Sequence, residues 1–294
     1  MPPLLPHKST AKRIRKQLKK RIENALAILS KQRVSASDIH EARKSLKKAR
    51  ASLRLLRPAL RGNDYREENA RLRDAARPLS SARDTHVLPD TLRLVAHHFG
   101  KPVSALQVKL KKDRSHLGSG DLAHSRRLLR EARTQLADLD FQDDNWSVVG
   151  PALKQVYRQG RRALAEARDQ GNPEAFHEWR KQAKYLRYAL ETLEPLWPPL
   201  VHSLADEAHE LTNYLGNDHD LTVLHERTGG PGPLSALITQ FQQELRQKAL
   251  QLGAKLYEEK PQVFTNRFGE YWKKWRNPPA GTVGHASAPS AGSC

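Results

Sequence analysis

The sequence contains one cysteine, Cys294. This scarcity excludes a disulfide framework and cysteine-based metal clusters, and it fits a reducing cytoplasm. Aromatic residues make up only 6% of the chain, which is little for a protein that stacks many nucleic-acid bases. No run approaches the roughly 18 apolar residues of a membrane span. Only Leu4 and Leu5 precede the first charges, so no secretory signal is expected. We therefore expect a cytoplasmic protein without a membrane partner.

Acidic residues are also comparatively few. The 294 residues include 51 Lys and Arg against 32 Asp and Glu, which gives a formal net charge of +19 at pH 7. A chain of this length can bury a sizeable core. The excess of positive charge predicts a polyanionic partner.

β-branched residues are scarce, and we find no alternating pattern typical of a strand. The sequence predicts an all-α fold with a linker near residues 138–150 and a disordered tail over 277–294. The expected helices lie near 9–31, 36–60, 64–82, 85–99, 103–117, 121–138, 149–170, 173–194, 199–216, 219–226, 234–259 and 262–276.

An internal repeat organises the chain. The pattern H-E-x-R-K-x-x-K-x-x-R occurs at His40–Arg50 and again at His177–Arg187, 137 residues later. A weaker match pairs Ser80–Asp84 with Tyr214–Asp218. Two matches in the same order predict a duplicated helical unit with halves at 8–140 and 149–276.

Each copy of the repeat predicts a helix with one basic and one apolar side. The apolar sides carry Ala42, Leu46, Ala49, Leu53 and Leu56 in the first copy, and Trp179, Ala183, Leu186, Leu190 and Leu193 in the second. We call the basic sides the first ladder (His40, Arg43, Lys44, Lys47, Lys48, Arg50 and Arg54) and the second ladder (His177, Arg180, Lys181, Lys184 and Arg187).

From Arg43 onward, the first ladder has no acidic neighbours in the sequence. Eight Lys and Arg residues and no Asp or Glu lie between Ala42 and Asn63. Solvated helices ordinarily alternate the sign of their charges, because like charges one turn apart repel. We therefore expect negative charge from outside this helix.

Three further basic stripes accompany the ladders. If all of them converge, they form a concave site in which Arg forks and Lys ammonium groups grip phosphate oxygens. The alternative is that they are only solubilising faces. The stripes are Lys12, Arg15 and Lys19; Arg126, Arg130 and Arg133; and Lys154, Arg158 and Arg161.

The doubled H-x-x-R-x-x-x-[RK]-x-x-R helix resembles the CHAD family, the conserved histidine α-helical domain. Tyr157–Arg162, Arg83–Asp84 and Asn217–Asp220 also look like elements of that family. The resemblance spans about residues 8–276. It implies two pseudo-symmetric helical bundles around a basic central cavity, with the His, Arg and Lys residues of both ladders as ligands.

The resemblance further implies binding of long-chain inorganic polyphosphate and recruitment to polyphosphate granules. Phosphate or sulfate ions would fit the same cavity. Many relatives carry Arg where this chain has Lys44, Lys47, Lys48 and Lys184. This difference keeps the charge but loses bidentate geometry. The E-x-E-x-K motif of the CYTH triphosphatase-like domain, which is fused to some relatives, does not occur, so a stand-alone binding domain is expected.

Other motifs have competing interpretations. His40 and His177 could each donate a hydrogen bond to phosphate or brace a neighbouring helix or carboxylate. Asp84, His86 and Asp218–Asp220 have no metal-ligand spacing, so capping and pairing with Arg are expected there. Aromatic residues near the C-terminus recur at helical spacing and predict a buried stripe rather than base stacking; they are Phe264, Phe268, Trp272 and Trp275.

The sequence thus predicts no catalytic residue, no metal and no cofactor. It contains no P-loop, and the ladders hold no carboxylates that could bind metal for hydrolysis. The leading hypothesis is a non-catalytic polyphosphate-binding module. A nucleic-acid-binding protein is the alternative, because net charge alone does not separate the two.

Overall fold

The computed structural model describes residues 3–106, 118–136, 145–228 and 232–278, with the backbone alone for 80–87 and 105–106. The described residues form ten α-helices and no strand, which confirms the predicted all-α class, although twelve helices were expected. The predicted tail, apart from Asn277 and Pro278, lies outside the described residues. The helices are α1 (Thr10–Leu29), α2 (Ala36–Leu55), α3 (Asp64–Ala76), α4 (Pro78–His98), α5 (Ser119–Gln135), α6 (Gly150–Gln170), α7 (Pro173–Leu193), α8 (Pro198–Thr228), α9 (Pro233–Leu256) and α10 (Pro261–Arg276).

Prolines punctuate the fold. Six α-helices carry a proline in their first turn, where the missing N–H removes no helical hydrogen bond. The first repeat ends at a proline too. We expected a helix to residue 60, but α2 ends at Leu55 and a short 3₁₀ helix, η1 (Arg57–Ala59), surrounds Pro58. Pro58 has no N–H to donate to the Arg54 carbonyl and its ring crowds that carbonyl, which explains the earlier end.

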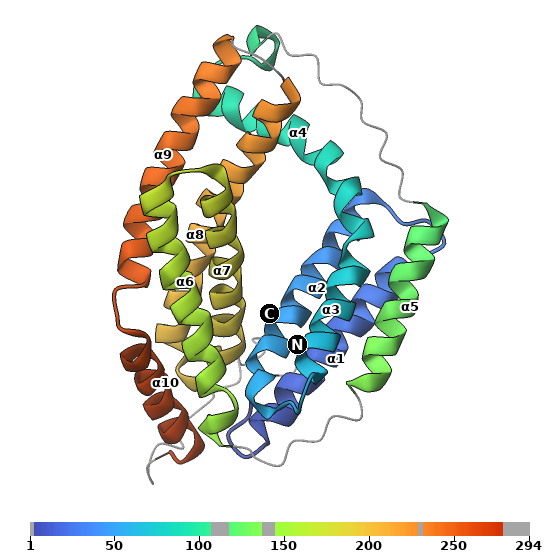
Figure 1. Cartoon of the computed structure of the whole chain (residues 1–294), viewed down its shortest axis with the longest axis vertical. Helices are drawn as coiled ribbons and strands as arrows, with labels where there is room; N and C mark the ends of the chain where they lie inside the picture. The colour runs from blue at the N-terminus through green and yellow to red at the C-terminus, as the bar shows by residue number, and fades with distance from the viewer. Residues whose placement is uncertain (1–2, 107–117, 137–144, 229–231, 279–294) are drawn as a thin grey trace, which may run out of the picture.

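The helices form two groups (Figure 1). One group contains α1, α2, α3 and α5, and the other contains α6 to α10. The groups meet at one end through η1, α6 and the 3₁₀ helix η3 (Trp146–Val148). At the other end α4 crosses from the first group to pack on α8 and α9. The two copies of the repeat lie on α2 and α7, which contact each other between these ends.

The main core joins both groups. The predicted apolar sides of the two repeat helices are buried, including Leu46 and Leu53 on α2 and Trp179 and Leu190 on α7. A second, smaller core lies among α4, α8 and α9, with Val95, Leu224 and Ile238 at its centre. No described helix has a stretch long and apolar enough to cross a bilayer.

Two expected helices are a single one. We predicted a break between residues 216 and 219, whereas α8 runs unbroken from Pro198 to Thr228. A mid-helix glycine costs only about 1 kcal/mol of helix stability, so tertiary packing can override it. Gly216 and Asp218 are both buried against neighbouring helices, and this packing carries the helix through the expected break.

Candidate functional site

Strong N-terminal caps position the two ladders. The Ser35 hydroxyl accepts a hydrogen bond from the Asp38 N–H, and the Asp38 carboxylate accepts one from the Ser35 N–H. This capping box starts α2 just before His40. The Asn172 side chain accepts a hydrogen bond of 2.8 Å from the Ala175 N–H, with Pro173 in the first turn of α7. Each ladder therefore begins about one turn into a firmly capped helix.

Two neighbouring pockets lie between α2, α7 and α8. The first, which we call the α7 pocket, has a volume of about 340 Å³. It is lined by Arg43, Lys47, Arg50, His177, Arg180, Lys181, Lys184, Tyr185, Tyr188 and His219. The second, the α8 pocket, has a volume of about 380 Å³. Its lining comprises His40, Arg43, Lys44, Lys47, Arg180, Lys184, Arg187, Tyr188, His209, Thr212, Asn213, Gly216, Asn217 and Asp220.

Cations from both ladders surround each pocket. Arg43 and Lys47 of α2 and Arg180 and Lys184 of α7 line both of them. Among the described residues that line the α7 pocket, none is a carboxylate. Positive charge from two distant parts of the sequence is thus focused on one space between low-dielectric walls.

Arg180 is the most enclosed of these cations, with 7% of the residue exposed. It lies against α8, where a Cβ added at Gly216 would be 3.6 Å from the Arg180 Nη2 atom. Asp218, two residues after Gly216 on α8, is buried as well. The Arg246 Nε–H of α9 donates to the Asp218 carboxylate at 2.7 Å, which confirms the expected pairing of Asp218 with an Arg.

Burial nevertheless dominates the titration of Asp218. It raises the pKa of this carboxyl above its ordinary value, although hydrogen bonds from Arg246 and Gln242 and the charge of Arg180 act in the opposite direction. The carboxylate is committed to Arg246 and Gln242 and does not line either pocket. Asp220 is the acidic residue among the described lining of the α8 pocket.

The two ladder histidines lie in different surroundings. The Nδ1 atom of His177 is 3.2 Å from the Nδ1 atom of His219 on α8, so His177 contacts a neighbouring helix. Burial, followed by the charges of Arg180 and Lys181, lowers the pKa of His177 below its ordinary value. His40 is exposed and lines the α8 pocket. Contact of either histidine with a ligand stays a prediction.

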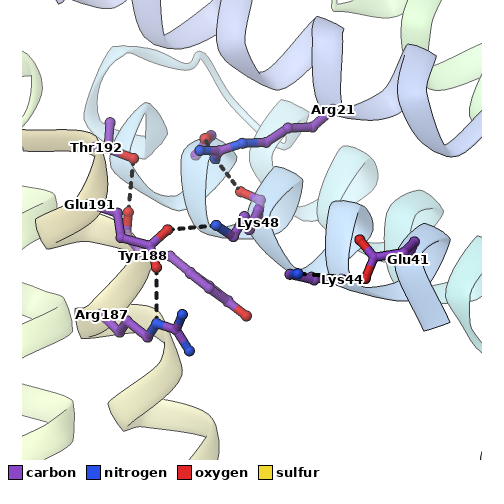
Figure 2. Close-up of polar contacts among 9 residues, drawn as sticks. Arg21, Glu41, Lys44, Lys48, Arg187, Tyr188, Glu191 and Thr192 are labelled. Carbon is purple, nitrogen blue, oxygen red and sulfur yellow. Dashed lines mark hydrogen bonds and ion pairs between the residues drawn. The ribbon is translucent and has the colours of Figure 1, made fainter. Parts of the chain in front are cut away.

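Lys48 has a counter-charge within the protein (Figure 2). Its Nζ atom donates to Glu191 of α7 at 2.7 Å, and the Arg187 Nε–H donates to the same carboxylate at 2.9 Å. We expected negative charge from outside this helix, and at Lys48 it comes from Glu191 of the same protein. Glu191 is 143 residues away in sequence, so the local charge pattern of α2 could not reveal it.

The first ladder has further contacts within the protein. Arg54 lies with its Cζ atom 4.0 Å from the centre of the Tyr185 ring and does not line either pocket. The Arg50 Nε–H donates to Asn69 of α3 at 3.0 Å. Lys44 pairs with Glu41 at 3.5 Å, and half of each side chain is exposed. Such exposed pairs contribute only about 0–1 kcal/mol, so an anionic ligand can replace them.

The three other basic stripes lie elsewhere. Those on α1 (Lys12, Arg15, Lys19) and α5 (Arg126, Arg130, Arg133) do not line either pocket, and neither does the one on α6 (Lys154, Arg158, Arg161). Two of the α6 residues bind the α10 region, since Lys154 donates to Gln262 and Arg161 to the Glu259 carbonyl. Periodicity showed that each stripe shares a helix edge but not which way that edge faces, so we leave these nine residues out of the proposed site.

Several residues that line the pockets were not predicted as ligands. His209, Asn213, Asn217 and Asp220 recur at three- and four-residue spacing and form one polar face of α8. Tyr185 and Tyr188 of α7 also line the α7 pocket. The regular spacing of polar residues on α8 could have predicted this face. We missed it because we expected the helix to break after residue 216.

The remaining motifs have structural roles or no described side chains. No described group of three or more His, Cys, Asp or Glu residues is arranged to hold a metal. The side chains of Asp84 and His86 lie outside the described residues, as does Arg83. Phe264 and Phe268 are buried and Trp272 and Trp275 pack against the core, which confirms the expected apolar stripe of α10.

Comparison with known families identifies the fold. The model of the CHAD domain matches residues 11–229, about three quarters of the chain. The chain belongs to the CHAD family. The match covers α1 to α8, and α9 and α10 follow it. No curated protein matches this CHAD chain.

Proposed function

We propose that this CHAD protein binds long-chain inorganic polyphosphate without catalysing its turnover. The binding site is the pair of α7 and α8 pockets, and its ligands are the ladder residues that line them. Binding of this kind would recruit the protein to polyphosphate granules. Family membership supports the proposal, and the pocket geometry suggests how the ligand is recognised.

The observation that carries the proposal is the meeting of the two ladders. Both pockets are lined by the same four cations, Arg43, Lys47, Arg180 and Lys184. The described lining of the α7 pocket contains no carboxylate. Polyphosphate repeats one anionic unit without bases, so repeated cations suffice to recognise it. Arg supplies bidentate contacts to phosphate oxygens and Lys supplies mobile point charge.

The pocket lining favours binding over hydrolysis. Metal-assisted hydrolysis of a phosphoanhydride requires carboxylates that hold the metal beside the cations. The described lining of the α7 pocket consists of Arg, Lys, His and Tyr residues, and that of the α8 pocket adds the single carboxylate of Asp220. We therefore expect no phosphate release from polyphosphate in the presence of Mg²⁺ or Mn²⁺.

The aromatic residues of the site also favour a ligand without bases. One face of Tyr185 is covered by the Arg54 guanidinium, and Tyr188 is buried. Nucleic-acid binders usually present open aromatic faces for stacking. Long polyphosphate should therefore displace tRNA or DNA at equal charge concentration, and the reverse order would favour the nucleic-acid alternative.

A paired substitution tests the site. We expect K47Q/K184Q to weaken the binding of long polyphosphate about twentyfold at ~0.1 M salt, because two fewer phosphates are neutralised and about 1.4 fewer counterions are released. The measurement is a titration followed by calorimetry or anisotropy, with circular dichroism as the check on folding.

The matched control is K248Q/K255Q. These two lysines are exposed on α9 and line neither pocket, and the control removes the same net charge. It should bind like the wild type. Equal losses in both variants would show that net charge rather than the site governs binding, and a well-folded K47Q/K184Q with unaltered affinity would refute the assignment.

A further inference from the structure

A third pocket lies beside the first ladder, between α2 and α3. Its volume is about 260 Å³. We call it the α3 pocket, and it is lined by Arg43, Leu46, Lys47 and Arg50 of α2, Arg73 and Ala76 of α3, and Arg77 at the junction with α4. Five of its seven lining residues are cations, and none is a carboxylate.

The α3 pocket is continuous in its lining with the proposed site. Arg43 and Lys47 line the α7, α8 and α3 pockets alike, and Arg50 lines the α7 and α3 pockets. Each of these three side chains is half-buried in the surface of α2. A flexible anion held in the α7 pocket therefore meets the same cations that form the wall of the α3 pocket.

Arg73 and Arg77 are placed to extend this cationic wall. Their side chains are 56% and 70% exposed. Both pair with Asp74, at 3.1 Å from the Arg73 Nε atom, and Asp74 does not line the pocket. Exposed ion pairs of this kind contribute little to stability, so a phosphate chain can replace Asp74 at little cost. The planar guanidinium groups suit bidentate contact with phosphate oxygens.

Another face of α2 borders a pocket in which the charges are balanced. There, Lys48 and Arg21 line a pocket together with Glu191 and Glu194. Glu191 already accepts hydrogen bonds from both Lys48 and Arg187 (Figure 2). This pocket has no excess of cations to attract a polyanion, whereas the α3 pocket has five cations and no carboxylate in its lining. The charge arrangement thus favours one exit for a long chain.

We propose that polyphosphate chains too long for the α7 and α8 pockets continue across α2 into an additional subsite formed by Arg73 and Arg77. This inference rests on the proposed function. It assigns a binding role to two residues outside both ladders, and it makes the length of the bound chain depend on α3.

The test compares a long and a short probe with R73Q/R77Q. We expect the affinity for long-chain polyphosphate to fall about twentyfold at ~0.1 M salt, with a salt dependence shallower by about 1.4 in the log–log slope. Binding of tripolyphosphate, which the α7 pocket can hold alone, should change by less than twofold. The measurements are titrations at several salt concentrations.

The control variant is R127Q/R162Q. These arginines are also exposed and also paired with carboxylates, Glu131 and Glu166, but they lie on α5 and α6 away from the three pockets. Three outcomes would overturn the subsite. R73Q/R77Q could lose the same affinity for both probes, the control could lose as much long-chain affinity as R73Q/R77Q, or R73Q/R77Q could keep its full long-chain affinity. If wild-type protein binds neither probe, the proposed function itself fails. If K47Q/K184Q loses both probes while R73Q/R77Q keeps both, only the subsite fails.

Discussion

His177 and His219 bring ionisable groups of α7 and α8 into contact at the α7 pocket. A hydrogen bond between two Nδ1 atoms requires one ring to donate and the other to accept, so at least one imidazole is neutral. Burial and the charges of Arg180 and Lys181 disfavour the imidazolium form of His177 and lower its pKa. This pair therefore carries a proton-dependent part of the protein's stability.

The sign of that dependence follows from linkage. Because the pKa of His177 is lower in the folded protein, the unfolded chain binds more protons once the pH falls through the ordinary His value near 6.5. The contribution of His177 to stability is thus fully present above that pH and decreases below it. We expect the difference in unfolding free energy between pH 7.5 and pH 5.5 to be smaller in His177→Asn than in wild type.

Urea denaturation at the two pH values measures this difference. The comparison uses the change with pH within each protein, so a general destabilisation by the substitution does not affect it. His225→Asn, at an exposed position near the end of α8, is the control and should keep the wild-type dependence. An unchanged dependence in His177→Asn would contradict the lowered pKa.

The two repeat helices show which residue-level features the sequence can predict. The apolar and basic sides of both ladders were predictable, because helical periodicity alone separates Leu46 from Lys47. The contacts of individual cations were not predictable. Lys48 is neutralised by Glu191 and Arg54 stacks on Tyr185, and both partners come from α7, the helix that carries the second copy of the repeat.

At the scale of elements, close packing of α9 on α7 depends on Gly253. A Cβ at this position would overlap the ring of Trp179, which is fully buried. Gly160 of α6 is similarly pressed against Tyr257. Glycine at these helical positions lets large aromatic rings of one element lie directly on the backbone of another.

We expect Gly253→Ala to lower the free energy of unfolding by up to about 2 kcal/mol. Overpacking a full core costs about 1–3 kcal/mol, and the roughly 1 kcal/mol that alanine gains as a helix former offsets only part of this cost. The measurement is equilibrium denaturation followed by circular dichroism. Gly120→Ala on α5 is the matched control, because a Cβ there meets nothing within 4 Å. A stability gain in both variants would contradict the packing argument.

Element boundaries illustrate the limits of the sequence in another way. Proline at the start of a helix was a dependable signal, as α7 and α9 show. Glycine and asparagine inside α8 were misleading, because their local preference for a break is small compared with burial of the helix between α7 and α9. Such packing depends on residues far away in the chain and leaves no local pattern.

At the scale of the whole molecule, the net charge and the pockets together predict how binding responds to salt. The α7 and α8 pockets contain eight Lys and Arg residues, namely Arg43, Lys44, Lys47, Arg50, Arg180, Lys181, Lys184 and Arg187. If each neutralises one phosphate, about 0.7 counterions are released per contact.

We therefore expect the logarithm of the binding constant for long polyphosphate to fall with the logarithm of salt concentration, with a slope as steep as about −6 from these pockets alone. Titrations between low and near-physiological salt measure it. Contacts in the α3 pocket would steepen the slope further. A slope near zero would show that counterion release does not drive binding and would contradict the electrostatic assignment.

The long helix α8 belongs to the wall of the α8 pocket through one stretch and to the second core through the next. His209, Asn213, Asn217 and Asp220 line the pocket, while Leu221 and Leu224 pack with α4 and α9. An unbroken helix of 31 residues spans roughly 46 Å. One continuous element therefore forms both the wall of the α8 pocket and the attachment of the crossing helix α4.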